Sequence, residues 1–426
     1  MKTFNSFTGA NTFKGDLCIM LILLVCTLSL GFAQQSSIKN IIYVNSSLSA
    51  NGDGSSWKTA YNSLETALLR ASIKSEIWVA KGIYYPERKV TGKDNRDRSF
   101  HLKNNVTLLG GFNGTEETRN QRNWKINITT LSGDLNQDDE SAQNLSDNAY
   151  HVVTGNGTNQ TAVIDGFTIS GGNADQDEWP NDGGGGINIE EGSPTIKNCT
   201  ITNNRAFADG GGIRVWGDSN PSISFCLFIK NESVQEGGGL MNGPGSHTKV
   251  FNCIFRNNKT GEDGAGMYNN ETTHQVIVNC LFYDNEATLT GGGMYNVNGS
   301  APLIVNCTFA NNTAKEVGGG MSNRDSNPIL RNCILWGNKA PKNFEINNLR
   351  STPDIAYSII SGGYNGMKII DVDPEFSDNR FELSNNSPAI DSGINEVFPN
   401  DISIDLNGNS RINDNIIDLG AYEFYK

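Results

Sequence analysis

The chain has 426 residues, 47 of them glycine, and a formal net charge of −13 at pH 7. This length is too great for one ordinary globular core, but it suits a stack of repeated units. The acidic balance argues against nucleic acid and anionic membrane surfaces as partners, and it is compatible with bound cations or neutral glycans.

Residues 1–33 have the pattern of a secretory signal peptide. Two lysines precede an uncharged apolar run over residues 17–30, and Gly31-Phe32-Ala33 is a small-x-small cleavage site. We therefore expect export, a mature chain that begins at Gln34, and no transmembrane span in that mature chain. An N-terminal membrane anchor is the alternative, although the apolar run is short for a span.

Residues 34–98 are predicted to cap a solenoid. We expect a strand at residues 38–44, a short amphipathic helix that begins at the capping box of residues 62–65, and a strand at residues 76–84. A helix in this position usually covers the open apolar end of a stack. Short, irregularly spaced strands follow up to residue 172, and the polar segment 173–182 is expected to project as a loop.

A regular repeat governs the centre of the chain. Six cysteines follow one another at spacings of 27, 27, 27, 27 and 26 residues, which is typical of a solenoid. An apolar residue two positions after each cysteine shares its strand face, and glycine triplets permit tight bends. The period predicts an all-β, right-handed parallel β-helix over residues 99–376, with three short strands per coil and regular coils over residues 196–340. The predicted cysteine ladder consists of Cys199, Cys226, Cys253, Cys280, Cys307 and Cys333.

The state of these cysteines has two interpretations. An even number in an exported chain suggests disulfides. Parallel neighbours about 4.8 Å apart, with parallel Cβ vectors, suit a disulfide poorly and favour a ladder of buried thiols. A second row, five residues after each cysteine, is always asparagine, whose side chain can bond its neighbour on the next coil. This row consists of Asn204, Asn231, Asn258, Asn285, Asn312 and Asn338.

The repeats resemble known families. Residues 38–376 resemble the parallel β-helix of pectate-lyase-like proteins. The Phe-x-x-Asn elements, such as residues 228–231, and the Gly-Gly-Gly-Met elements, such as residues 318–321, are similar to repeats of polymorphic outer membrane proteins. Residues 387–393, 405–411 and 418–423 resemble the choice-of-anchor Q type domain, so we expect a small C-terminal element at residues 377–426. The resemblance implies an adhesin-like protein, secreted or on the outer membrane of a Gram-negative bacterium.

Acidic side chains form a row ten residues after the first three cysteines. Asp209, Glu236 and Asp263 stand there, and Asp182 precedes the preceding glycine run. Stacked carboxylates about 5 Å apart repel one another, and a bound Ca²⁺ would relieve the repulsion. The alternative is a solvated acidic stripe. Met241, Tyr268 and Tyr295 are expected to point outward beside this row, either as a platform for a sugar or as ordinary surface residues of a strand.

A second candidate metal site lies near the C-terminus. Asp405, Asn407 and Asn409 alternate around a glycine, as in the first half of a calcium loop, and Asp418 or Glu423 could complete the ligand set. The alternative is a turn rich in asparagine and aspartate.

These patterns predict a non-catalytic exported β-helix that binds a glycan or a host or cell-surface component, with Ca²⁺ as the one candidate cofactor. The alternative is a polysaccharide lyase or hydrolase that acts on an acidic glycan in a groove on the side of the β-helix. A purely structural spacer is the third interpretation. A catalytic site should show a cationic base in a walled cleft, whereas an adhesin should show a flat face.

Overall fold

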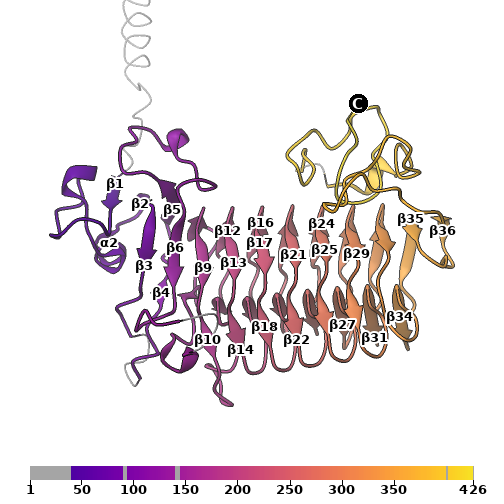
Figure 1. The fold of residues 1–426 in the computed structure, drawn as a ribbon, viewed down its shortest axis with the longest axis horizontal. Coiled ribbons are helices and arrows are strands. Elements are labelled where there is room, and N and C mark those ends of the chain that lie inside the picture. Colours follow the sequence, from indigo (N-terminus) through magenta and orange to yellow (C-terminus); the bar gives the residue numbers. More distant parts are fainter. Residues whose placement is uncertain (1–39, 90–93, 140–143, 400–401, 426) are drawn as a thin grey trace, which may run out of the picture. The chain divides into compact units, whose positions relative to one another are not determined.

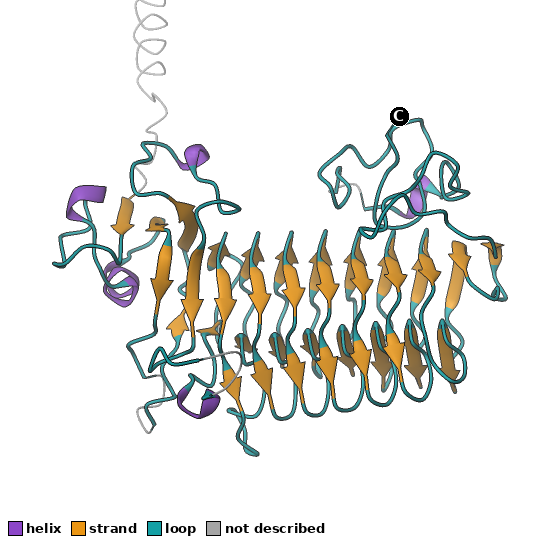
Figure 2. Cartoon of the chain, viewed as in Figure 1, coloured by secondary structure: helices purple, strands orange, loops and turns teal. Residues whose placement is uncertain are grey.

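The computed structural model describes residues 40–89, 94–139, 144–399 and 402–425, so the predicted signal peptide lies outside the described residues. Ile41–Lys426 form one compact unit, to which the features below belong. Strands of successive coils pair in parallel and build three sheets, as Figures 1 and 2 show. The predicted all-β, right-handed parallel β-helix is confirmed. No helix in the described residues is long and apolar enough to cross a membrane.

The largest sheet has 21 strands. It consists of β1 (Asn40–Val44), β2 (Ser75–Ala80), β3 (Gly82–Tyr84), β5 (Val106–Phe112), β6 (Thr129–Ser132), β8 (Val163–Asp165), β9 (Thr168–Ser170), β12 (Thr195–Lys197), β13 (Thr200–Thr202), β16 (Ser222–Ser224), β17 (Leu227–Ile229), β20 (Lys249–Phe251), β21 (Ile254–Arg256), β24 (Val276–Val278), β25 (Leu281–Tyr283), β28 (Leu303–Val305), β29 (Thr308–Ala310), β32 (Ile329–Arg331), β33 (Ile334–Trp336), β35 (Asp354–Ile360) and β36 (Met367–Ile370).

Two further sheets complete each coil. The six-stranded sheet consists of β10 (Asn173–Ala174), β14 (Arg205–Ala206), β18 (Glu232–Ser233), β22 (Lys259–Thr260), β26 (Glu286–Ala287) and β30 (Thr313–Ala314). The nine-stranded sheet consists of β4 (Phe100–His101), β7 (Val153–Thr154), β11 (Ile187–Glu190), β15 (Ile213–Trp216), β19 (Leu240–Asn242), β23 (Met267–Asn270), β27 (Met294–Val297), β31 (Met321–Arg324) and β34 (Ile346–Leu349). The helices are α2 (Leu64–Arg70) and the 3-10 turns η1 (Trp57–Thr59), η2 (Arg119–Gln121), η3 (Leu145–Asp147) and η4 (Asn395–Val397).

The predicted ladders lie inside the coils. Phe228, Phe255, Phe282 and Phe309 stack with ring centroids 4.3–4.6 Å apart and nearly parallel planes. All six cysteines of the array are free and buried, so the thiol interpretation is confirmed for these residues. Burial raises the pKa of the Cys280 thiol, which keeps it neutral.

The predicted asparagine ladder is also confirmed. For example, Asn258 Nδ2 donates to Asn285 Oδ1 at 2.9 Å and to the Phe228 carbonyl at 3.0 Å. A further buried ladder, which the sequence analysis missed, lies sixteen residues after four of the cysteines, and its side chains bond at 2.8–2.9 Å. It runs through Asn242, Asn269, Asn296, Asn323 and Asn348.

Helix α2 begins as the sequence predicts. The Ser63 side chain caps it by accepting the Thr66 N–H, and Leu64 and Leu68 are buried in the main core. The strand predicted at residues 76–84 is divided into β2 and β3, because the φ of 147° at Gly82 begins a new strand.

The C-terminal element packs on the outer face of the largest sheet, where Figure 1 shows it in yellow. Tyr422 and Leu419 contact outward apolar side chains of β25 and β33. An asparagine precedes five of the six array cysteines, and four of these side chains donate to backbone carbonyls of the element. They are Asn252, Asn279, Asn306 and Asn332. The element is therefore part of the same compact unit as the β-helix.

Candidate functional site

The predicted acidic row is half-buried, and most of its carboxylates have partners. Asp182 Oδ1 pairs with Arg214 Nη1 at 2.5 Å, the Tyr268 hydroxyl donates to Glu236, and Asp263 accepts the N–H and hydroxyl of Thr290. Within the described residues, the three carboxylates whose oxygens lie within 4.8 Å of one another belong instead to Asp134, Asp138 and Asp139. Calcium binding at the acidic row therefore stays a prediction, because the structure does not bring three of these carboxylates together as one ligand set.

Asp209 and Glu236 are neighbours on adjacent coils. Burial, together with the Glu236 carboxylate, raises the pKa of Asp209 to about 7. Burial also raises the pKa of Glu236, which the hydrogen bond from Tyr268 opposes. Because the folded state holds a proton that the unfolded state releases near pH 4, the pair lowers stability progressively as the pH rises from about 4 to about 7.

We therefore expect Asp209→Asn to stabilise the protein by about 2 kcal/mol more at pH 8 than at pH 5, because the raised pKa of Asp209 costs stability over the whole interval between its unfolded and folded values. Urea unfolding at the two pH values measures the difference. Asp218→Asn, which replaces an exposed carboxylate outside the row, is the control. Equal effects of Asp209→Asn at both pH values would contradict the coupling.

The predicted aromatic platform is wrong. Met241, Tyr268 and Tyr295 are only 1–3% exposed and pack against one another. Their side chains lie outside the coil interior, but Gly237, Gly264 and Gly291 turn the preceding segment tightly against them. A ligand cannot stack on rings that are covered in this way.

The predicted calcium turn has other partners for its oxygens. Asp405 Oδ1 accepts the N–H groups of Asn407 at 3.0 Å and Asn409 at 2.8 Å, and its other oxygen accepts from Glu423. Both Asp418 oxygens also accept backbone N–H groups. This arrangement favours the turn interpretation over the calcium interpretation.

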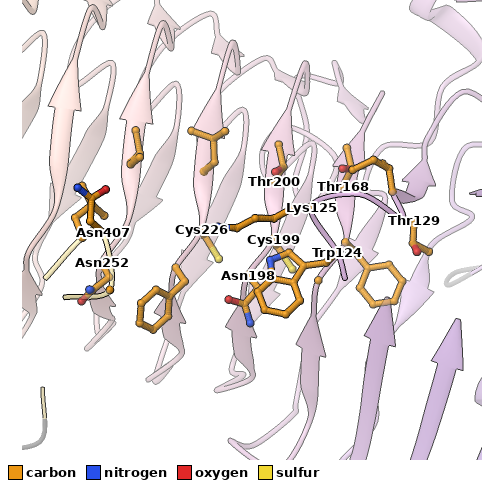
Figure 3. A pocket seen from close by; sticks show the side chains of 18 residues that line it. Trp124, Lys125, Thr129, Thr168, Asn198, Cys199, Thr200, Cys226, Asn252 and Asn407 are labelled. Carbon is orange, nitrogen blue, oxygen red and sulfur yellow. The ribbon is translucent and has the colours of Figure 1, made fainter. Parts of the chain in front are cut away.

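A cleft that the sequence analysis did not predict lies on the outer face of the largest sheet. We call it the side cleft; its volume is about 470 Å³, and Trp124, Lys125, Asn198, Phe225 and Asn407 are among the residues that line it. Figure 3 shows Asn252 and Asn407 at one side and Thr129 at the other. None of its described lining residues carries a carboxylate.

A buried ion pair holds the Trp124 indole in position. The Arg122 guanidinium lies 4.8 Å from the indole ring and is fixed by Asp165 through an ion pair of 2.6 Å. Asn198 Nδ2 donates to the same Asp165 oxygen at 2.8 Å. Because Arg122 and Asp165 are nearly fully buried, the indole is a preorganised wall of the side cleft.

The opposite wall belongs to the C-terminal element. Leu406, Asn407 and Gly408 line the side cleft there, and Asn252 Nδ2 donates to the Asp405 carbonyl. The turn that resembled a calcium loop therefore closes the cleft.

A second cavity, which we call the edge groove, has a volume of about 550 Å³ and lies where β9, β13 and β17 end. Arg205, Lys230, Asp134 and Asp139 line it. No described residue forms an ion pair with Lys230, whereas Arg205 pairs with Glu232 at 3.4 Å. The sequence by itself does not indicate this grouping, because Lys230 and residues 134–139 are about 90 positions apart in the chain.

The sequence did contain a signal for this face. The outward positions of β6, β9 and β13 carry hydroxyl side chains, whereas those of β17, β21 and β25 are mainly apolar or aromatic. We call the first set the hydroxyl floor. It consists of Thr130, Ser132, Thr168, Ser170, Thr200 and Thr202.

Two comparisons agree with this architecture. The family described as the right-handed beta helix region matches residues 141–309. The crystal structure of pectate lyase Pel9A is similar with a TM-score of 0.50 and 14% identity, over 90% of this chain and 96% of that chain. No curated protein matches the sequence. At this identity the likeness carries the fold alone: the chain is a right-handed parallel β-helix of the kind seen in a pectate lyase.

Proposed function

We propose that the protein is an exported, non-catalytic glycan-binding protein whose ligand lies in the side cleft. The observation that carries the proposal is a walled cleft with an indole, hydroxyls and amides on its surface and no carboxylate among its described lining residues. Pyranose rings offer an apolar C–H face to an aromatic ring and hydroxyls to amide and hydroxyl groups. The cleft is walled and is lined by Lys125, but none of its described lining residues has a carboxylate that could take part in hydrolysis of a glycosidic bond or hold a Ca²⁺ beside a uronate.

Location at the cell exterior rests on the signal-peptide pattern of residues 1–33. The resemblance to polymorphic outer membrane proteins and anchor-type domains supports an adhesin-like role on a Gram-negative surface. The ligand would then be a glycan of a host or of a neighbouring cell.

We expect Trp124→Ala to weaken glycan binding by about tenfold or more, because a fixed aromatic wall contributes strongly to a small interface. A glycan array identifies the ligand, and calorimetry compares the variants with and without EDTA. Phe344→Ala, which removes an exposed ring outside the cleft, is the matched control. An unchanged affinity of Trp124→Ala would exclude the side cleft as the binding site.

A second candidate function, a polysaccharide lyase, is favoured by the edge groove. In a lyase, Lys230 would be the cationic base, and Asp134, Asp138 and Asp139, whose oxygens lie within 4.8 Å of one another, would hold a Ca²⁺ beside a uronate carboxylate. Release of an unsaturated, ultraviolet-absorbing product that disappears with EDTA and in Lys230→Asn would establish this function and overturn the non-catalytic proposal.

A further inference from the structure

We propose that the side cleft and the edge groove are the two ends of one binding groove, which holds an oligosaccharide along the strands β6, β9, β13 and β17. This inference rests on the proposed glycan-binding function and extends it to the length, direction and charge of the ligand.

The strands themselves connect the two cavities. Each of the four places a residue in the side cleft near its start and another in the edge groove at or just after its end. The pairs are Thr129 and Ser132, Thr168 and Ser170, Thr200 and Asn203, and Leu227 and Lys230. A ligand that leaves one cavity along the strand direction therefore enters the other.

The surface between the cavities suits a glycan. The hydroxyl floor carries six side-chain hydroxyls on three adjacent parallel strands, five on half-buried residues and one on the buried Ser132, whose hydroxyl accepts the Asp134 N–H. Neighbouring strands lie about 4.8 Å apart, so these hydroxyls form a grid to which sugar hydroxyls can bond. Farther along the same face the C-terminal element covers the sheet, so the open stretch is confined to the coils that carry the hydroxyl floor and to the adjacent coil of β17.

Two backbone outliers mark the ends of the groove. The residue before each array cysteine has a positive φ and is asparagine in five coils, but it is Phe225, with φ of 54°, in the sixth. The residue four positions after the cysteine is asparagine, aspartate or glycine in five coils, but it is Lys230, with φ of 56°, in the same coil. Asparagine and glycine tolerate this left-handed conformation much better than phenylalanine or lysine.

The two outliers have complementary chemistry. Phe225 is 42% exposed and lies in the side cleft, where its ring can stack on the C–H face of a pyranose. Lys230 is exposed in the edge groove beside Arg205, where its ammonium group can bind an acidic substituent. Each end of the groove therefore carries a bulky side chain in a strained backbone conformation, which a ligand-binding role would explain.

The row of residues that directly precede the array cysteines argues against a peptide ligand. Where the chain's own C-terminal element covers this face, Asn252 and Asn306 recognise its backbone carbonyls. In the open groove the corresponding residues are Asn198, whose Nδ2 donates to Asp165, and Phe225, which has no amide. The distance from Phe225 to Lys230 is roughly 15 Å along the strand, so the ligand must be longer than one sugar ring.

The test replaces Phe225 and Lys230 by asparagine, the residue that most other coils carry at these two positions. Phe225→Asn and Lys230→Asn should leave the melting temperature unchanged or higher, because asparagine fits the left-handed backbone. Affinity is measured for the glycan found on the array as a series from monosaccharide to hexasaccharide, in neutral, carboxylated and sulfated forms. Phe344→Asn and Lys249→Asn, which change exposed residues outside both cavities, are the controls.

For the unmodified protein we expect affinity to rise with chain length until the ligand spans both cavities. Phe225→Asn should weaken binding of every length by about tenfold, and Lys230→Asn should weaken binding by about tenfold only for long, acidic ligands. Comparison of the carboxylated and sulfated ligands shows which acidic group Lys230 binds. Affinity that is independent of length, with no effect of Lys230→Asn on any ligand, would overturn the single groove while leaving glycan binding in the side cleft intact. Absence of binding to every glycan would overturn both proposals.

Discussion

Replacing Asn258 by alanine should lower the free energy of unfolding by about 3–5 kcal/mol, because four hydrogen bonds of a fully buried side chain are lost. Asn258 Nδ2 donates to the Phe228 carbonyl and to Asn285, and Asn258 Oδ1 accepts from the backbone and side-chain N–H groups of Asn231. Alanine leaves these partners inside the coil without water, so each retains its desolvation cost.

Chemical unfolding followed by circular dichroism measures the effect. Asn257→Gly is the matched control, because Asn257 is the exposed neighbour with a φ of 53°, which glycine adopts without strain. A loss of stability in Asn258→Ala no larger than in this control would mean that the asparagine ladder is not a source of stability. The result bears on the binding groove as well, since the ladder fixes the spacing of the coils on which the hydroxyl floor stands.

Replacing Arg411 by methionine should detach the C-terminal element at neutral pH. The Arg411 side chain is 1% exposed, and Nη2 donates to the carbonyls of Asp418 and Gly420. The carboxylates of Asp405, Asp418 and Glu423 lie buried around it. Without the cation these negative charges are left unpaired in the interior, which costs about 3–5 kcal/mol.

The loss should depend on pH. Burial raises the pKa of Glu423 to about 7, an effect that Arg411 opposes, and burial also raises the pKa of Asp418. Removing the cation raises both pKa values further, so the folded element binds protons more strongly and is destabilised as the pH rises. We therefore expect Arg411→Met to expose residues 377–425 to hydrogen exchange much more at pH 8 than at pH 5. Protection that is independent of pH would contradict the role of the cation.

Loss of the element also has a functional consequence. Asn407 and Gly408 form one wall of the side cleft, and Asn252 holds that wall through the Asp405 carbonyl. Arg411→Met should therefore weaken glycan binding at pH 8, although Arg411 does not line the cleft. Arg380→Met is the control, because Arg380 is an exposed arginine of the same element that is paired on the surface.

The sequence alone determined the fold and the register of the repeat. The spacing of Cys199, Cys226 and the following cysteines defines one coil, and the inward phenylalanines and asparagines follow because side chains two apart share a strand face. Such rows are local and periodic, so every coil repeats the same signal. The parallel ladders and the buried thiols therefore follow from pattern and spacing.

Tertiary structure decided where a ligand can bind. Tyr268 and Tyr295 point away from the core as the repeat period predicts, but the preceding turn covers them. The period of the sequence does not show which segments will cover an outward side chain. The side cleft needs Trp124 from an irregular N-terminal loop and Asn407 from the C-terminal element, two segments that meet only because both pack on the same face of the sheet. The period of the repeat indicates which side chains point outward, whereas the packing of non-repeating segments decides which of these side chains remain exposed.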